Sequence, residues 1–331
     1  MAGQASFRPG QVSGVDSPRR FVISAEHGGQ RLDRVVSSVI AATRSQAKVL
    51  IDQARVMVNG QPKKAGYCVR VGDTLCIEPL PAAPTTAAPQ AIPLDVLYED
   101  EVLLAINKPP AMVVHPAPGQ WQGTVVNALL FRWGWRDSGH SLRPGILHRL
   151  DKDTSGVLLV AKDESSAEHL ARQFRARQVH KTYAAVAVGR FRARTGRIEL
   201  PIGRHPTDRK KMSVQARHSR AALSRYQVVA EAQGLSFVRL FPTTGRTHQL
   251  RVHMAALGHP LVGDQMYGPA QARLRGAPAV AQTFGRQALH AEAIRFSHPV
   301  QGRTMTIRAP YPPDMRALLE AMGVSETRPV N

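Results

Sequence analysis

The chain has 331 residues and carries 44 Lys and Arg against 24 Asp and Glu, which gives a formal net charge of +20. Such an excess favours a polyanionic partner, because basic side chains that bind phosphates release counterions. A membrane surface is the competing partner, but no stretch approaches the roughly 20 apolar residues of a spanning helix. The composition therefore predicts a nucleic-acid partner and no membrane.

Cysteine content and the N-terminal segment indicate the cellular compartment. The two cysteines, Cys68 and Cys76, are too few for a disulfide framework or a zinc site built from thiolates, and we expect both to be small buried hydrophobes. Residues 1–20 lack the apolar core of a secretory signal. We therefore expect a flexible N-terminal tail and a cytoplasmic protein.

A domain boundary is marked by composition. Residues 79–90 are rich in Pro and Ala and have no periodic hydrophobicity, so they predict a semi-extended linker. We place a small module at 21–80, the linker at 81–92, a large module at 93–320 and a flexible tail at 321–331. The hydrophobic fraction of 43% leaves room for two cores.

The small module is predicted to contain two helices followed by strands. One helix opens in the segment 31–36, and a second covers 44–51, where apolar residues recur at helical spacing. The strand at 56–58 is followed by Asn59-Gly60, a strong signal for a tight hairpin turn. A further turn and strand are expected at 71–77.

The large module mixes strands and helices without strict alternation, which predicts an α+β fold with a mostly antiparallel sheet. A helix is expected at 165–177, and residues 269–285 are expected to form a mobile loop or insertion. A further helix is expected to begin at Arg246 and to end at Gly258, with Leu250, Met254 and Leu257 mainly in the core. The expected strands are 102–106, 157–161, 183–188, 226–230 and 235–241.

One carboxylate, Asp151, lies between Arg149 and Lys152, just ahead of the apolar run 157–161. That run predicts a buried strand, so Asp151 would lie in the loop that precedes it. The neighbouring basic side chains favour the ionised carboxylate, which suits a nucleophile. The alternative is an ordinary solvated ion pair.

The surrounding sequence favours chemistry, because PGILHRLDKDTSGVLLVAK closely resembles the catalytic segment of the RluA family of pseudouridine synthases. The resemblance runs from roughly residue 31 to 310. Within the family, the chain most resembles the members that act on large-subunit ribosomal RNA. It rests on further motifs in the same order: INKPP (106–110), GTVVNAL (123–129), KTY (181–183), PIGRHPT (201–207), GRTHQLRVHM (245–254), HPLVGD (259–264) and RQALHA (286–291).

The resemblance implies a pseudouridine synthase fold and roles for particular residues. Asp151 is the catalytic residue in HRLD, Tyr183 lines the base and handles a proton, and Arg246 pairs with Asp151. Leu250 packs behind the pocket. Arg149, whose alternative is a salt bridge to Asp153 or Glu164, is expected to fill the gap that a flipped uridine leaves, and His148 of the same motif is expected to help bind substrate.

The small module is similar to the alpha-L RNA-binding domain of ribosomal-protein-S4 type. This resemblance implies that the exposed Arg44, Lys48 and Arg55 meet phosphates, whereas an ordinary solvated helix face is the alternative. Such modules usually carry Gly where this chain has Ala54. A left-handed residue there would cost Ala about 1 kcal/mol or more, so we expect the turn to be built differently.

The expected function is the isomerisation of specific uridines to pseudouridine in large-subunit ribosomal RNA, with no cofactor, no metal and no obligate protein partner. Action on other ribosomal sites or on transfer RNA is an alternative, as is a non-catalytic RNA-binding assembly factor. A metal-dependent nuclease using Asp151 and Asp153 is a third. The histidines His248 and His253 are five apart, unlike the i, i+4 pair of a zinc helix, so we expect packing or phosphate contacts there.

Overall fold

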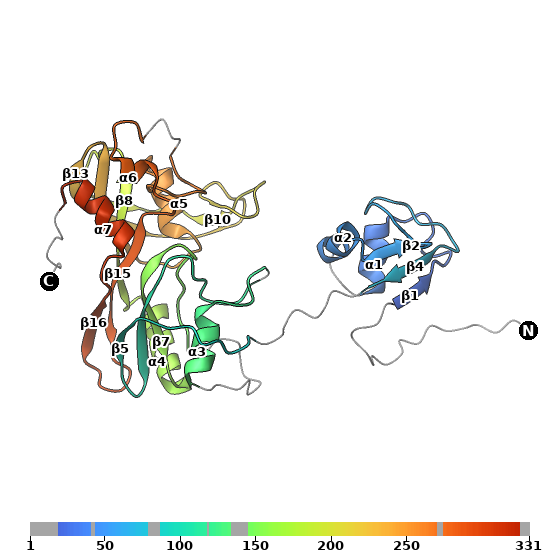
Figure 1. The fold of residues 1–331 in the computed structure, drawn as a ribbon, viewed down its shortest axis with the longest axis horizontal. Coiled ribbons are helices and arrows are strands. Elements are labelled where there is room, and N and C mark those ends of the chain that lie inside the picture. The colour runs from blue at the N-terminus through green and yellow to red at the C-terminus, as the bar shows by residue number, and fades with distance from the viewer. Residues whose placement is uncertain are drawn as a thin grey trace, which may run out of the picture. The chain divides into compact units, whose positions relative to one another are not determined.

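The computed structural model describes residues 19–40, 44–78, 87–117, 119–133, 145–269 and 274–324. The chain divides into two compact units, one up to Thr85 and the other from Thr86 onward, and each is described by itself. Figure 1 shows the smaller unit in blue and the larger one from green to red. The boundary falls inside the predicted linker.

The small unit packs the two predicted helices against a four-stranded antiparallel sheet, whose first strand precedes the helices. Asn59 and Gly60 have φ values of 52° and 76°, the two positive values that the predicted hairpin turn requires. The helices are α1 (Leu32–Val39) and α2 (Arg44–Asp52), and the strands, in sheet order, are β1 (Arg19–Val22), β4 (Thr74–Ile77), β2 (Val56–Val58) and β3 (Gln61–Pro62).

The turn after α2 is left-handed at Ala54, so the expectation of a different turn is wrong. Ala54 has a φ of 55°. Its N–H donates to the carbonyl of Ile51 at 3.0 Å, and the N–H of Arg55 donates to the carbonyl of Leu50 at 2.9 Å. These are the two hydrogen bonds of a Schellman helix end, and they offset the roughly 1 kcal/mol that an L-residue loses in this conformation.

Two other expectations for the small unit are corrected. Cys68 is exposed and Cys76 is partly exposed, so neither is a buried hydrophobe. Along β4 the side chains of Leu75 and Ile77 enter the core, and alternation directs Cys76 to the opposite face. Arg19 and Arg20 pair with β4, so the part of the predicted tail that is described belongs to the sheet.

In the described part of the large unit, nine strands form one sheet in which all neighbours run antiparallel except β7 and β15. The predicted α+β class is therefore confirmed. In sheet order the strands are β5 (Val96–Glu99), β6 (Leu103–Lys108), β7 (Ser155–Ala161), β15 (Leu289–Ser297), β8 (His180–Val188), β14 (Leu235–Pro242), β13 (Ser224–Ala232) and β9 (Thr195–Ile198), with β16 (Thr304–Arg308) paired to β15. A second small sheet joins β11 (Met212–Ser213), β10 (Ile202–Arg204) and β12 (Ser219–Arg220).

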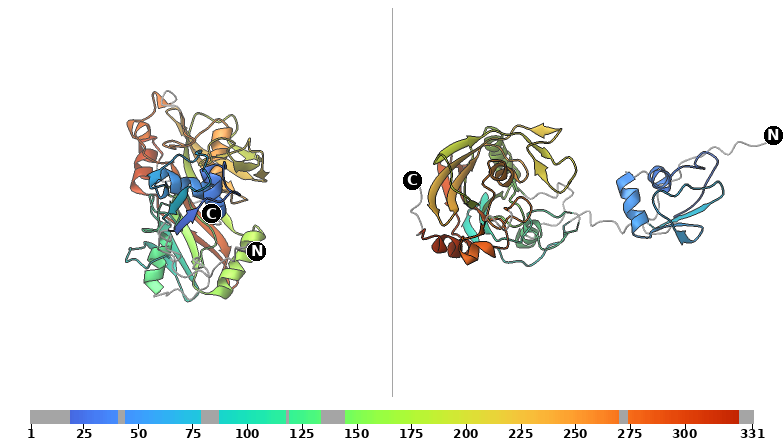
Figure 2. Two further views of the ribbon diagram at one scale, coloured as in Figure 1. Left: turned by 90° about the vertical axis from the view of Figure 1, so that its right-hand side faces the viewer. Right: turned by 90° about the horizontal axis from the view of Figure 1, so that it is seen from above.

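Helices cover both faces of the large sheet, and alternate side chains of strand β8 pack into the core on each face. Tyr183 and the residues two apart from it join the core that contains Leu250 and Met254. The alternate residues, beginning with Ala184, join the core under Met315. Figures 1 and 2 show α7 along one side of this unit, away from α5. The helices are α3 (Val125–Trp133), α4 (Glu164–Arg175), α5 (Gln249–Ala256), α6 (Ala279–Gln282) and α7 (Pro313–Ala321).

Two predicted segments and one predicted core residue of the large unit differ from the structure. Leu274 and Phe284 are buried in the core under α7, so the described part of 269–285 is not a mobile loop. Residues 270–273 lie outside the described residues. Met322 and Val324 pack in the same core, so no tail begins at 321. By contrast, Leu257, predicted to lie in the core, is 38% exposed.

The predicted linker also ends earlier than 92. The side-chain amide of Asn127 donates to the carbonyl of Ala88 at 2.7 Å, and the N–H of Gly123 donates to Oε1 of Gln90 at 2.7 Å. Residues 87–92 are therefore attached to the large unit, and residues 81–86 lie outside the described part. Among the described residues, no helix is long and apolar enough to cross a membrane.

Candidate active site

A cavity of about 610 Å³ opens on the face of the large sheet that α5 covers. Its walls come from the loop before β7, the end of α4, the start of β8 and the turn before α5. Among the described residues that line it, Asp151 is the single carboxylate, and it is surrounded by arginines, a lysine and histidines. The cavity therefore suits an anionic ligand that presents one reactive centre to Asp151.

The loop that carries Asp151 is held by buried cations on its backbone carbonyls. Lys108 Nζ donates to the carbonyl of Lys152 at 3.0 Å, and Arg286 Nη1 donates to the carbonyl of Asp153 at 2.9 Å. Lys108 is 0% exposed. The two residues that follow Asp151 are thus fixed, and the Asp151 side chain remains 19% exposed to the cavity.

Lys108 anchors this loop at a high electrostatic cost. Its ammonium also donates to the carbonyls of Pro109 and Met112, at 2.7 and 2.9 Å, so three carbonyls share three N–H donors. Burial lowers the pKa of Lys108 to about 7, and the charge of Asp153 opposes that shift. A group that is costly to bury and fully hydrogen-bonded points to a positioning role.

The carboxylate of Asp151 is oriented by Arg251. Arg251 Nη1 lies 3.1 Å from Asp151 Oδ2, while its Nε and Nη2 lie 2.7 and 2.8 Å from the two oxygens of Asp264. This bidentate pair fixes the guanidinium plane, and the remaining nitrogen meets Asp151. Burial opposes ionisation of Asp264, but Arg251 outweighs it, so the pKa of Asp264 lies below its usual range.

The prediction that Arg246 pairs with Asp151 is therefore wrong in this structure. The Arg246 Nε donates to the carbonyl of Ala221 at 3.1 Å. The physical reason is the start of α5: the helix begins at Gln249, whose side chain accepts from the Arg246 N–H at 3.0 Å. Arg246 thus lies in the turn before the helix and lines the cavity, and Arg251 lies in the first turn.

Tyr183 and Leu250 both line the cavity. Tyr183 is 8% exposed, lines the cavity and pairs with Leu240 across the sheet. Burial, and then the charge of Asp151, raise the pKa of Tyr183 above its usual range, so the phenol stays protonated. Leu250 is 6% exposed and forms part of the apolar wall.

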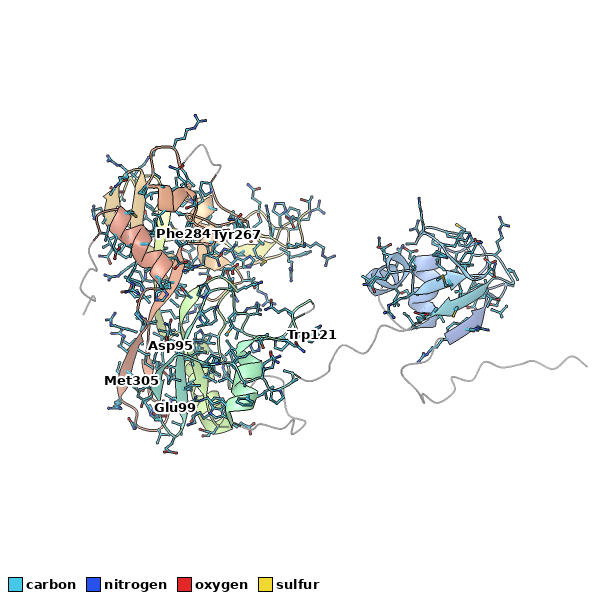
Figure 3. The ribbon with its side chains drawn as sticks, in the orientation of Figure 1. Asp95, Glu99, Trp121, Tyr267, Phe284 and Met305 are labelled. Carbon is cyan, nitrogen blue, oxygen red and sulfur yellow. The ribbon has the colours of Figure 1, made fainter. Side chains whose placement is uncertain are left out.

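His248 lines the cavity and has a left-handed backbone conformation. It has a φ of 55° and a ψ of 18°, directly before α5. Its Nδ1 lies 2.8 Å from the hydroxyl of Tyr267, which accepts the N–H of Met212 at 2.7 Å. The Tyr267 ring also lies 5.1 Å from the Arg251 guanidinium. Figure 3 shows Tyr267 in the half of the unit that holds α5 and β10, far from Glu99 and Met305.

Comparisons with known proteins identify the family of this chain. A family model described as RNA pseudouridylate synthase matches residues 102–256, and an S4 domain model matches residues 30–75. Ribosomal large subunit pseudouridine synthase D of Xanthomonas campestris is 40% identical over 319 residues, which cover 94% of this chain and 95% of that protein. The protein of the same name from Yersinia pestis is 41% identical over 300 residues, which cover 89% of this chain and 91% of that protein. The chain belongs to the RNA pseudouridylate synthase family.

A solved structure supports the fold of this pseudouridine synthase. Human RNA pseudouridylate synthase domain containing 1 aligns with a TM-score of 0.54 at 29% identity, over 69% of this chain and 89% of that one. The family membership makes the chain an isomerase, as predicted.

The residues His148 and Arg149 of the HRLD motif differ in environment. Arg149 is exposed and lines the cavity, and among the described residues it forms no ion pair with Asp153 or Glu164. His148 stacks on Phe174 with centroids 5.4 Å apart, and its Nε2 accepts the N–H of Leu159 at 2.9 Å. Burial, and then the charge of Lys181, lower the pKa of His148 to about 3. His148 is thus a neutral wall of the cavity.

Of the predicted RNA-binding residues of the S4 unit, Arg44 and Lys48 are exposed but paired, and Arg55 is only partly exposed. Arg44 Nη2 lies 2.8 Å from Asp33 Oδ2, and Lys48 Nζ lies 2.5 Å from Asp52 Oδ2. More than half of each basic side chain remains exposed, at 63% and 60%. Phosphate contact by Arg44 and Lys48 stays a prediction.

Several residues of the synthase site were missed by sequence reasoning. Arg251 lies in the same motif as Arg246, but the sequence does not reveal which of them faces Asp151 until the start of α5 is known. The roles of Lys108 and Asp264 depend on contacts across 44 and 13 residues, respectively. No group of three His, Cys, Asp or Glu side chains that could hold a metal occurs in the part of the chain that is described.

Proposed function

We propose that this synthase isomerises specific uridines to pseudouridine in large-subunit ribosomal RNA, in the cytoplasm, with Asp151 as nucleophile and with no cofactor. The observation that carries the proposal is the placement of Asp151. Its carboxylate faces a basic cavity, is oriented by Arg251 and lies near the protonated phenol of Tyr183. The names of the relatives in Xanthomonas campestris and Yersinia pestis support the large-subunit substrate.

The proposed reaction is an exchange of bonds within one nucleotide. The carboxylate of Asp151 forms a bond to C1′ of the sugar while the C1′–N1 bond of uridine breaks. The base leaves with the electron pair of that bond. The base then turns and its C5 bonds to C1′, which releases the carboxylate. The proton on C5 is lost and N1 ends protonated, so nothing is oxidised or added. The demand on the enzyme is orientation of a detached base in a closed site.

Other cavity residues have roles in this proposal. Tyr183 lines the base and, being protonated, serves as a hydrogen-bond donor when charge shifts on the base. Leu250 forms the apolar floor. Arg149, exposed at the cavity mouth, takes the place of the flipped uridine in the RNA. Arg246 does not pair with Asp151 and lines the cavity, where its guanidinium can bind the RNA backbone.

RNA affinity comes from charge outside the cavity. The net charge of +20 provides a salt-sensitive attraction to phosphates. Arg44 and Lys48 of the S4 unit contribute to it when phosphate replaces their carboxylate partners. No protein partner is required by this scheme.

The deciding experiment maps pseudouridine by carbodiimide treatment and primer extension in large-subunit RNA incubated with the purified protein. The wild type and Asp151→Asn are compared, each with and without a metal chelator. We expect new stops with the wild type alone, unchanged by the chelator. These stops also name the modified sites.

Other outcomes separate the alternatives. Absence of stops with either protein, despite tight and salt-sensitive RNA binding, would favour an assembly factor or a different RNA. A matched reaction on transfer RNA distinguishes those two. Chelator-sensitive strand scission that needs Asp151 and Asp153 would indicate a nuclease.

A further inference from the structure

Lys181 is a half-buried cation in the cavity wall that the proposed chemistry does not use. It lies on β8 two residues before Tyr183, so both side chains are on the face of the sheet toward the cavity. Two positions along a strand correspond to about 7 Å. Lys181 and Tyr183 are therefore neighbours along one wall of the cavity.

The surroundings of Lys181 supply no opposite charge. Among the described residues it forms no ion pair and no side-chain hydrogen bond, and its Nζ lies 5.9 Å from the centroid of the Phe174 ring. A Cβ built on Gly245 would come within 3.9 Å of this nitrogen, so the glycine leaves open space there. Burial lowers the pKa of Lys181. A desolvated ammonium without a carboxylate is favourable only if an anion joins it.

The neighbouring residues extend the same positive wall. Arg175 and Arg177, at the end of α4, line the cavity beside Lys181 and are exposed. His148, which feels the charge of Lys181, stays neutral and adds no competing cation. The cavity's one carboxylate among the described residues, Asp151, is already paired with Arg251. The anion that completes this wall must come with the substrate.

We propose that Lys181 binds a non-bridging phosphate oxygen of the RNA backbone at a linkage adjacent to the flipped uridine. The contact fixes the sugar of that nucleotide relative to Asp151 and leaves the chemical steps to other groups. Arg175 and Arg177 lie further out on the same wall and receive the next stretch of backbone. This inference rests on the proposed function and specifies which part of the substrate the wall recognises.

The test is a cycle that removes each partner of the contact in turn. RNA oligonucleotides carry the uridine mapped above and one uncharged methylphosphonate, moved linkage by linkage through three positions on either side. Each is assayed for kcat and KM with wild type, Lys181→Met, Lys181→Arg and the control Lys210→Met, which removes an equal charge from the exposed β10 to β11 turn.

We expect Lys181→Met to raise KM roughly tenfold while leaving kcat within about threefold, as loss of one charged hydrogen bond implies. One methylphosphonate next to the uridine should raise KM of the wild type by a similar factor. The same methylphosphonate should raise KM of Lys181→Met by less than about twofold. Lys181→Arg should retain the response of the wild type, and Lys210→Met should respond like the wild type at each linkage.

If the effects of Lys181→Met and of the methylphosphonate on KM are additive at each linkage, the phosphate site is refuted. Lys181 is then a packing residue over Phe174. Thermal unfolding of both Lys181 variants identifies a folding defect, and if Lys181→Met is unfolded, Lys181→Gln, which also removes the charge, takes its place in the cycle. A wild type that makes no pseudouridine in unmodified RNA would instead refute the proposed function. The two failures are therefore distinguishable.

Discussion

Arg251 Nη1 lies 3.1 Å from Asp151 Oδ2, while the other two nitrogens of the same guanidinium hold both oxygens of the buried Asp264. Replacing Arg251 by Lys keeps a charge but loses this fork, so we expect kcat to fall on the order of 100-fold as the Asp151 carboxylate loses its orientation. Arg251→Met should also destabilise the large unit by about 3–5 kcal/mol, because Asp264 is left buried and unpaired. Single-turnover assays and urea unfolding measure these effects.

The matched control is Arg246→Met, which removes a cavity arginine that does not reach Asp151. Its kcat should stay within about tenfold of the wild type, with the larger effect on KM. A variant at Arg246 that lost more turnover than Arg251→Lys would show that the pairing seen here is not the one used in catalysis.

Tyr183→Phe should lower kcat by about 100-fold or more and leave RNA binding nearly unchanged, because the hydroxyl is removed from a side chain that is otherwise part of the core. The pKa of Tyr183 is raised by burial and by Asp151, so the phenol remains protonated across ordinary assay pH. The ratio of wild-type to variant rates should therefore be constant from pH 6 to about 9.5. A ratio that changes tenfold per pH unit would indicate a phenolate.

Gly156 follows the loop that carries Asp151, at the point where β7 meets β15. Its φ is 111°, and a Cβ there would lie 2.3 Å from the carbonyl oxygen of Ala291. Gly156→Ala should destabilise the large unit by about 3 kcal/mol or more. The alanine would have a strained φ, and the backbone at Ala291 would also have to move away from its Cβ. Gly234→Ala is the control: its φ is 76° with open space around it, and about 1 kcal/mol is expected. Equal effects in urea unfolding would contradict the clash.

His148 should make the large unit sensitive to acid. Its pKa is lowered to about 3 in the fold, against about 6.5 in an unfolded chain. The unfolded chain binds the extra proton between these values, so the stability due to neutral His148 is complete above pH 6.5 and is lost as pH falls toward 3. At pH 5 the loss is about 2 kcal/mol.

The comparison protein for that prediction is His148→Gln, whose amide oxygen can accept the Leu159 N–H without titrating. Urea unfolding at pH 7.5 and pH 5 should show the larger drop in the wild type. Equal drops in both proteins would mean that other groups, such as the buried His290, cause the acid sensitivity.

Truncation should separate affinity from chemistry, because the cavity residues belong to the large unit. Removing residues 1–86 should raise KM for RNA on the order of tenfold or more and keep kcat within about twofold. Removing residues 1–92 should in addition cost about 2 kcal/mol of stability, since the bonds of Ala88 and Gln90 to the large unit are lost. Loss of all turnover at saturating RNA in the shorter deletion would refute this division.

Local patterns determined much of the secondary structure. The apolar run 157–161 became the fully buried β7, and Asn59-Gly60 formed the hairpin turn, because both depend on neighbours along the chain. The motif around Asp151 likewise indicated the family. Burial of Cys76 and Leu257 was predicted wrongly, since the hydrophobicity of one residue does not reveal which face of an element it occupies.

The sequence by itself determined that this protein is a two-unit, basic pseudouridine synthase with Asp151, Tyr183 and Leu250 at one cavity. Only the tertiary structure decided that Arg251 rather than Arg246 meets Asp151, and that Lys108 holds the loop from the end of β6. The physical reason is that such contacts depend on where a helix begins and on which distant groups share a buried space. Those are properties of packing, which residue type and spacing do not specify.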